Sequence, residues 1–227
     1  MKEKKNTNTE IKKRRFLNIN VKEQQLFTFS VRDITEIAIL CALAIALDRF
    51  VKIPVGATGG SINLAALPLH IIAFRHGWFK GFIGAGLVFG VTTCLLDAYG
   101  FQYFLFDYFI AFGCIGLAGL IGYFIHSLYG KKEFKYQLLS YVFILLSVIA
   151  YCIIRTLSAS VDSMIFYEYK FIPSVVYNIS YIGPSAVIDF VLLCILMPAI
   201  YALNMQMPSS YFKAIFNEKK QEEENED

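Results

Sequence analysis

One acidic residue, Asp107, stands alone inside a long apolar stretch. It is the only charged residue between Phe101 and Ile125, a run of 25 residues that is long enough to cross a membrane. A charged side chain at the bilayer centre costs roughly 2.5–3.5 kcal/mol on insertion scales, so it normally faces a polar cavity or a partner and has a function. A carboxylate in this position suits a ligand that is positively charged or donates hydrogen bonds.

Further polar side chains occur near the same ends of the predicted helices. Asn178 and Tyr181 are three residues apart and therefore share one face of a helix. Arg155 closes another apolar stretch. Three more tyrosines offer aromatic faces: Tyr108, Tyr167 and Tyr177. A carboxylate, an amide and several tyrosines predict a pocket for a small aromatic cation, held by charge pairing, hydrogen bonds and cation–π contacts.

Each of these residues also has a structural interpretation. Tyrosines near the ends of membrane helices commonly anchor a protein at the interface. The stem of Arg155 could carry its charge to the membrane surface, and Asn178 could form an interhelical hydrogen bond. Asp107 and Arg155 could form a buried ion pair. The sequence indicates no ligand role for Asp189, which lies deeper in the last apolar stretch.

The composition places these residues in a membrane protein. Of 227 residues, 56% are hydrophobic and 17% are charged, compared with about 25% charged residues in an ordinary soluble domain. Residues 1–32 hold nine of the 21 lysines and arginines, and residues 218–227 hold six of the 18 acidic residues. We predict a basic cytoplasmic tail over residues 1–30, a membrane domain over 31–204 and an acidic-ended cytoplasmic tail over 205–227.

Six apolar segments predict an all-α integral membrane protein, a bundle of six transmembrane helices. They cover residues 34–51, 62–74, 78–96, 101–125, 138–154 and 172–203. The second has 13 residues and contains Pro68, so it is too short to cross a core of roughly 30 Å unaided and should be a short or broken span. Pro184 and Pro198 suggest kinks in the last. Four glycines in the third allow close helix contact: Gly81, Gly84, Gly86 and Gly90.

The distribution of positive charge predicts the orientation. With both termini in the cytoplasm, 17 of the 21 lysines and arginines lie inside and four lie outside, in agreement with the positive-inside rule. The outer connections are then residues 52–61, 97–100 and 158–171. Asp107 follows the second connection by seven residues, roughly 10 Å of helix. The candidate site therefore opens outward, under a lid formed by the first and third connections.

The sequence argues against metal, redox and hydrolytic chemistry. The five cysteines lie singly in apolar segments, as buried apolar side chains do. The histidines form no HExxH motif, and there is no GxSxG motif or phosphate-binding Walker loop. We expect no cofactor, metal or nucleic-acid partner, and any ATP must be used by a partner subunit. Two other classes stay open: an intramembrane enzyme using Asp97 and Asp107, and a scaffold whose polar residues only join helices.

Several motifs, spread over residues 34–203, resemble one known family. They are Gly59-Gly-Ser-Ile-Asn-Leu64, Leu67-Pro-Leu69 with Ala73-Phe-Arg-His-Gly77, Phe106-Asp-Tyr108 with Ala111-Phe112 and Gly116-Leu-Ala-Gly-Leu120, and Tyr177-Asn178 with Tyr181 and Pro184. These motifs resemble the thiamine-specific substrate-binding subunits, or S components, of energy-coupling-factor (ECF) transporters. The resemblance implies a six-helix bundle that captures thiamine outside. A transmembrane coupling subunit and two cytoplasmic ATPases would then reorient it to release the vitamin inside.

The resemblance also implies roles for individual residues. Asp107 matches the carboxylate that faces the cationic vitamin, Tyr108 and Tyr167 match aromatic positions, and Arg155 and Asn178 match a basic and an amide position. The candidate substrate-binding residues are therefore Asp107, Tyr108, Arg155, Tyr167, Asn178 and Tyr181. A surface of small residues on the first helix matches the one that docks the coupling subunit: Ala38, Ala42 and Ala46.

Two positions depart from the family pattern. Ala159 stands four residues after Arg155, where relatives carry a histidine. The only tryptophan, Trp78, lies on the predicted cytoplasmic side, whereas relatives often carry one in the first outer loop. We therefore expect a vitamin-capture subunit in a bacterial cell membrane with thiamine as its ligand. A thiamine precursor or another vitamin is the alternative.

Overall fold

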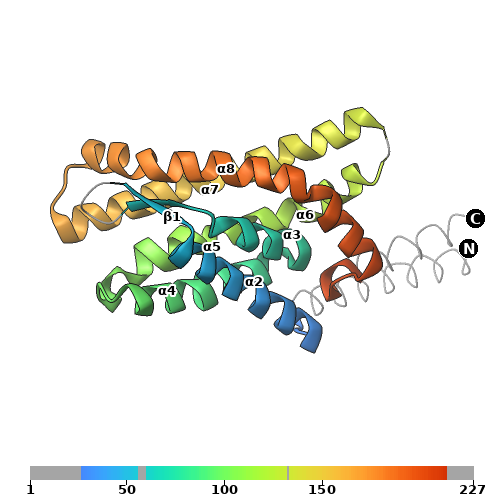
Figure 1. Cartoon of the computed structure of the whole chain (residues 1–227), viewed down its shortest axis with the longest axis horizontal. Helices are drawn as coiled ribbons and strands as arrows, with labels where there is room; N and C mark the ends of the chain where they lie inside the picture. The colour runs from blue at the N-terminus through green and yellow to red at the C-terminus, as the bar shows by residue number, and fades with distance from the viewer. Residues whose placement is uncertain (1–26, 56–59, 132, 214–227) are drawn as a thin grey trace, which may run out of the picture.

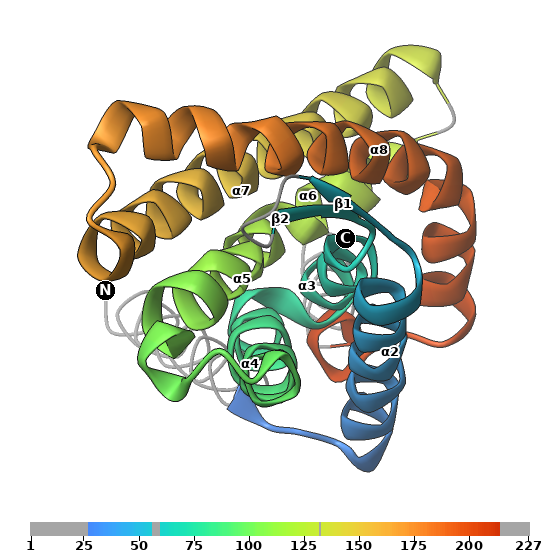
Figure 2. The same cartoon turned by 60° about the vertical axis from the view of Figure 1, so that its left-hand side comes forward.

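The computed structural model is a bundle of helices with one small hairpin (Figure 1). It describes residues 27–55, 60–131 and 133–213, so most of both predicted tails lies outside the described residues. Helix α2 (Val31–Phe50) leads into strands β1 (Lys52–Val55) and β2 (Gly60–Asn63). The strands are antiparallel, with Lys52 opposite Asn63. Figure 2 shows this hairpin between α2 and the pair formed by α7 and α8.

The remaining chain forms four long helical stretches. The first joins α3 (Ala66–Phe82), a π-helical segment (Ile83–Phe89) and α4 (Gly90–Asp97). The second joins a 3₁₀ turn (Phe101–Tyr103), a π-helical segment (Phe104–Ile110), α5 (Ala111–Gly113), another 3₁₀ turn (Cys114–Ala118) and α6 (Gly119–Tyr129). Helices α7 (Phe134–Tyr167) and α8 (Phe171–Gln206) complete the bundle and lie side by side in both views.

These elements agree with the predicted membrane fold. By length and composition, four helical stretches could cross a membrane: Ala66–Asp97, Phe101–Tyr129, Phe134–Tyr167 and Phe171–Gln206. Helix α2 matches the first predicted segment but carries several charges. The hairpin is an addition to the predicted all-α architecture, because the start of the second segment pairs as a strand before α3 begins.

A single glycine divides the first long stretch into the two segments that the sequence predicts. Gly77 has a φ of 82° inside α3, a conformation that a side chain strongly disfavours. The helix before this break is short, as expected for the segment that contains Pro68. Pro68 lies in the first turn of α3, where a missing backbone N–H costs little. The prediction of a short or broken span is confirmed.

Backbones approach closely where small residues face each other. A Cβ added to Gly116 would lie 2.6 Å from the backbone nitrogen of Phe82, and one added to Gly119 would lie 2.3 Å from that of Trp78. From the other side, a Cβ on Gly81 would lie 3.2 Å from the Cα of Gly116. Close packing predicted from the glycines of the third segment is therefore confirmed, and it depends on glycines of the fourth segment as well.

Helix α7 is longer than predicted. It continues to Tyr167, so only residues 168–170 connect it to α8, and the predicted outer loop over residues 158–171 is wrong. The polar residues that suggested a loop are compatible with a helix, because the hydroxyls of Ser160 and Ser163 donate to the carbonyls of Thr156 and Ala159 one turn earlier. Figure 1 shows α8 bending near its carboxy-terminal end.

A network of buried charges joins α2, α3 and α8 at the end of the bundle away from the hairpin. The ammonium group of Lys80 lies 2.9 Å from a carboxylate oxygen of Asp33, and both side chains are almost fully buried. Arg75 forms an ion pair with Glu36 and donates to the amide oxygen of Asn204 at 2.5 Å. The sequence analysis used Arg75 and Lys80 only as indicators of orientation and did not predict this network.

The Asp33–Lys80 pair gives the first testable prediction. In Asp33→Asn the side chain keeps its shape, but Lys80 is left buried without its counter-charge, so we expect a loss of about 3–5 kcal/mol in the free energy of unfolding. The measurement is equilibrium or thermal unfolding in detergent. The control is Glu133→Gln, which breaks the exposed Glu133–Lys135 pair and should cost less than about 1 kcal/mol. Equal effects of the two substitutions would contradict the prediction.

Candidate functional site

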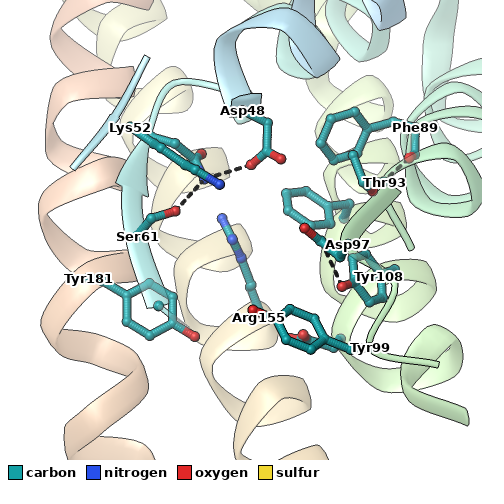
Figure 3. A pocket seen from close by; sticks show the side chains of 14 residues that line it. Asp48, Lys52, Ser61, Phe89, Thr93, Asp97, Tyr99, Tyr108, Arg155 and Tyr181 are labelled. Atoms are coloured by element: carbon teal, nitrogen blue, oxygen red, sulfur yellow. Dashed lines mark hydrogen bonds between the residues drawn. The ribbon is translucent and has the colours of Figure 1, made fainter. Parts of the chain in front are cut away.

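A polar cavity of about 130 Å³ lies where the hairpin meets the helices (Figure 3). Its charged lining residues come from α2, β1, α4, the Phe104–Ile110 segment and α7: Asp48, Lys52, Asp97, Asp107 and Arg155. A second cavity of about 90 Å³ shares five lining residues with the first: Gly60, Tyr99, Asp107, Tyr108 and Tyr181. The two cavities therefore form neighbouring parts of one polar site.

Asp107 lines both cavities, and in the described part of the chain Arg155 attracts its carboxylate from beyond ion-pair distance. It forms no hydrogen bond or ion pair there, so the buried pair with Arg155 that the sequence left open is not found. Asp107 lies in the π-helical segment Phe104–Ile110, a kind of irregularity that often occurs at functional sites. Its carboxylate is available to a ligand.

Tyr108 is held in place by a neighbouring acid. Its hydroxyl donates to Asp97 at 2.8 Å, and the other carboxylate oxygen of Asp97 accepts from Arg49 at 2.8 Å. Figure 3 shows Asp97 and Tyr108 side by side at the cavity wall. Both carboxylate oxygens of Asp97 thus accept hydrogen bonds from protein side chains. Tyr108 itself lines both cavities.

Arg155 points into the bundle and lines the first cavity. Its guanidinium carbon lies 4.3 Å from the centroid of the Phe112 ring, and its Nη1 donates to the hydroxyl of Tyr151. A cation over an aromatic face is stabilised by the ring quadrupole. The predicted alternative, in which Arg155 extends to the membrane surface, is therefore not what the structure shows, because the side chain is buried.

Asn178 and Tyr181 share one face of α8, as their spacing predicts. The hydroxyl of Tyr181 donates to the amide oxygen of Asn178 at 2.6 Å, and both residues line the second cavity. The amide nitrogen of Asn178 donates to Ser174 in the same helix and to Ser160 in α7. The interhelical hydrogen bond considered for Asn178 is therefore present, and the residue still contributes to the cavity wall.

Tyr167 stands at the end of α7 and also lines the second cavity. Its ring stacks on that of Tyr103, with centroids 5.8 Å apart and planes at 19°. Its side chain is about half exposed. All six predicted site residues thus line at least one of the two cavities.

The hairpin is attached to α8 over the site. The hydroxyl of Tyr177 accepts a hydrogen bond from the backbone of Gly60 at 3.1 Å, and the hydroxyl of Ser185 accepts one from the backbone of Asn63 at 3.2 Å. A Cβ on Gly60 would lie 2.5 Å from the ring of Tyr181, so only glycine fits there. The connection predicted over residues 52–61 therefore packs over the site, as expected, although its residues 56–59 lie outside the described part.

Sequence reasoning missed several residues of the cavities. Asp48 accepts a hydrogen bond from the side chain of Asn63 at 3.0 Å, and Lys52 begins the hairpin. Asp162 lines the second cavity. Asp48 and Lys52 lie at the end of the first apolar segment. The sequence analysis used the positive charges there to predict orientation and did not consider either residue as part of a site. Asp162 was assigned to a loop, so its position on a helix face could not be used.

The sequence analysis also predicted a docking surface on the first helix and no metal site. The proposed docking residues Ala38 and Ala42 are exposed on α2, and Ala46 is partly buried. Among the described residues, no group of three or more histidine, cysteine, aspartate or glutamate side chains is placed to hold a metal ion.

Comparison with known proteins gives consistent matches. The family model described as thiamine transporter protein (Thia_YuaJ) matches residues 34–206. The thiamine transporter ThiT of Bacillus subtilis is 28% identical over 176 residues, which cover 71% of this chain and 88% of that protein. A solved structure of ThiT from Listeria monocytogenes superposes with a TM-score of 0.62 at 21% identity, covering 75% of this chain and 97% of that one. This last match supports the fold.

Proposed function

The chain belongs to the thiamine transporter protein family, and on that basis we propose that it captures thiamine as the S component of an ECF importer. The observation that carries the proposal is the carboxylate of Asp107, which lines both cavities and has no hydrogen-bond or ion-pair partner among the described residues. Thiamine carries a fixed positive charge on its thiazolium ring. A carboxylate in a low-dielectric site is the natural counter-charge for it.

The remaining predicted residues suit the other parts of the vitamin. Thiamine has two aromatic rings, and Tyr108 and Tyr167 present aromatic rings at the walls of the second cavity. Asn178 and Tyr181 supply an amide and a hydroxyl on the α8 side. In this proposal the vitamin enters from the outside, beneath the hairpin. Its thiazolium faces Asp107, and its rings lie against the tyrosines.

The alternatives from other classes have less support. An intramembrane enzyme built on Asp97 and Asp107 would need both carboxylates free to exchange protons, but Asp97 is bonded to Arg49 and Tyr108. In a scaffold protein, a buried carboxylate without an ion-pair partner would lower stability and bring no function in return. Family membership favours a transporter over both.

Import against a gradient requires energy, and we propose that partner subunits supply it. The exposed alanines on α2 would dock a transmembrane coupling subunit, because small side chains let two helix backbones approach closely. Two cytoplasmic ATPases would then drive the reorientation that releases the vitamin. This chain itself would bind no nucleotide.

Replacing Asp107 tests the site. Asp107→Asn keeps the shape and removes the charge, so we expect thiamine to bind at least about tenfold more weakly, a loss of about 1.4 kcal/mol. Titration calorimetry on detergent-purified protein measures this. The matched control is Glu168→Gln, which removes an exposed charge at the same end of the molecule but outside both cavities. Unchanged affinity in Asp107→Asn would remove Asp107 from the site.

The identity of the ligand has its own check. Mass spectrometry of small molecules released from purified protein should detect thiamine. Release of a different vitamin, together with no thiamine binding by calorimetry, would contradict the proposed substrate and leave the fold unaffected.

The docking surface gives another prediction. The double substitution Ala38→Leu with Ala42→Leu places bulk on α2, away from the residues that line the cavities. Thiamine affinity should stay within about twofold, less than about 0.5 kcal/mol, whereas co-purification of the coupling subunit and cellular thiamine uptake should be lost. Ala150→Leu with Ala199→Leu, which adds the same bulk at exposed positions of α7 and α8 outside both cavities, is the control. Full uptake by the double variant would exclude this surface as the docking site.

A further inference from the structure

Asp162 is a second carboxylate at the site that has no hydrogen-bond or ion-pair partner among the described residues. It lies on α7, its side chain is only 4% exposed, and it lines the second cavity together with Asp107. Its Oδ1 is buried and has no hydrogen-bond partner among the described residues. A buried carboxylate in this state costs free energy unless something else supplies a donor or a positive charge.

Several hydrogen-bond donors among the described residues that line the second cavity are used elsewhere. The hydroxyl of Ser163, the next residue, donates to the carbonyl of Ala159 at 2.9 Å. Across the second cavity, the hydroxyls of Tyr181 and Tyr108 donate to Asn178 and Asp97. The polar lining thus offers acceptors and few free donors, and a ligand that fits must bring donors of its own.

The backbone places Asp162 where a ligand can reach it. Ala159 lies three residues earlier on the same face of α7 and also lines the second cavity. Asp107 and Asp162 also lie close enough for their carboxylates to repel each other, which favours a ligand with positive or donating groups at two positions.

We propose that Asp162 is a second substrate-binding carboxylate, which accepts a hydrogen bond from the exocyclic amine of the aminopyrimidine ring of thiamine. The inference rests on the proposed capture of thiamine, in which Asp107 faces the thiazolium. One carboxylate then meets the fixed charge of the ligand and the other meets its amine donor. Asp162 would therefore determine specificity for ligands that carry an amine on this ring.

The arrangement predicts two effects of opposite sign. Asp162→Asn removes a buried, unpaired charge, so the ligand-free protein should melt at a higher temperature than the wild type. The same substitution should weaken thiamine binding at least about tenfold, because the charged acceptor is replaced by a neutral amide and the hydrogen bond to it becomes weaker. A residue that only supported the fold would lower both stability and affinity. Thermal unfolding without ligand and titration calorimetry with thiamine measure the two effects.

A ligand variant identifies the group that Asp162 binds. Wild-type protein should bind thiamine at least about tenfold more tightly than 4′-deaminothiamine, which lacks the amine, because a charged acceptor left unpaired is costly. In Asp162→Ala this preference should fall to about twofold or less, with the affinity for 4′-deaminothiamine little changed. Glu168→Gln should keep the wild-type preference.

The outcomes separate the inference from the proposed function. If wild-type protein binds no thiamine, the proposed function fails, and this inference fails with it. If thiamine binds but the wild type does not distinguish the deamino analogue, or if Asp162→Ala keeps the full preference, Asp162 is not the acceptor. Should Asp162→Ala fail to fold, Asp162→Ser replaces it, and the wild-type comparison of the two ligands still decides whether the amine is recognised.

Discussion

A charge inside a membrane protein must be compensated, and this fold compensates its charges at one end of the bundle and leaves some uncompensated at the other. Away from the hairpin, Asp33 pairs with Lys80 and Glu36 pairs with Arg75, so the buried acids and bases match. Beneath the hairpin, Asp107 has no such pair among the described residues. Buried pairs with good geometry hold helices together, whereas an unpaired carboxylate lowers stability and is retained where a ligand completes it.

Irregular backbone builds the site within otherwise regular helices. The π-helical segment Phe104–Ile110 changes the direction of the side chains of Asp107 and Tyr108 relative to a continuous α-helix. The break at Gly77 divides the neighbouring stretch, and close contact at Gly116 packs the two stretches against each other. Helices packed at this distance leave little room for side chains between them, and the two polar cavities lie above this contact, at the end covered by the hairpin.

Much of this arrangement could be predicted from the sequence because membrane insertion restricts it. The apolar segments, the exceptional position of Asp107 and the shared face of Asn178 and Tyr181 follow from length, charge and helical period. What could not be predicted depends on tertiary contacts. Ser160 and Ser163 are polar enough to suggest a loop, but α7 continues through them, and their hydroxyls are accommodated by hydrogen bonds to carbonyls of the same helix.

Pairing is the other property that single-sequence reasoning could not supply. From the sequence alone, Arg155 could have extended to the membrane surface, paired with Asp107 or lined the cavity. Its position over Phe112 shows that it lines the cavity. The same argument applies to α2. One end of this helix supplies Asp48 to the cavity, its middle exposes Ala38 and Ala42, and its other end is tied to Lys80 through Asp33. A single helix of 20 residues thus contacts the site, the proposed docking surface and the buried charge network.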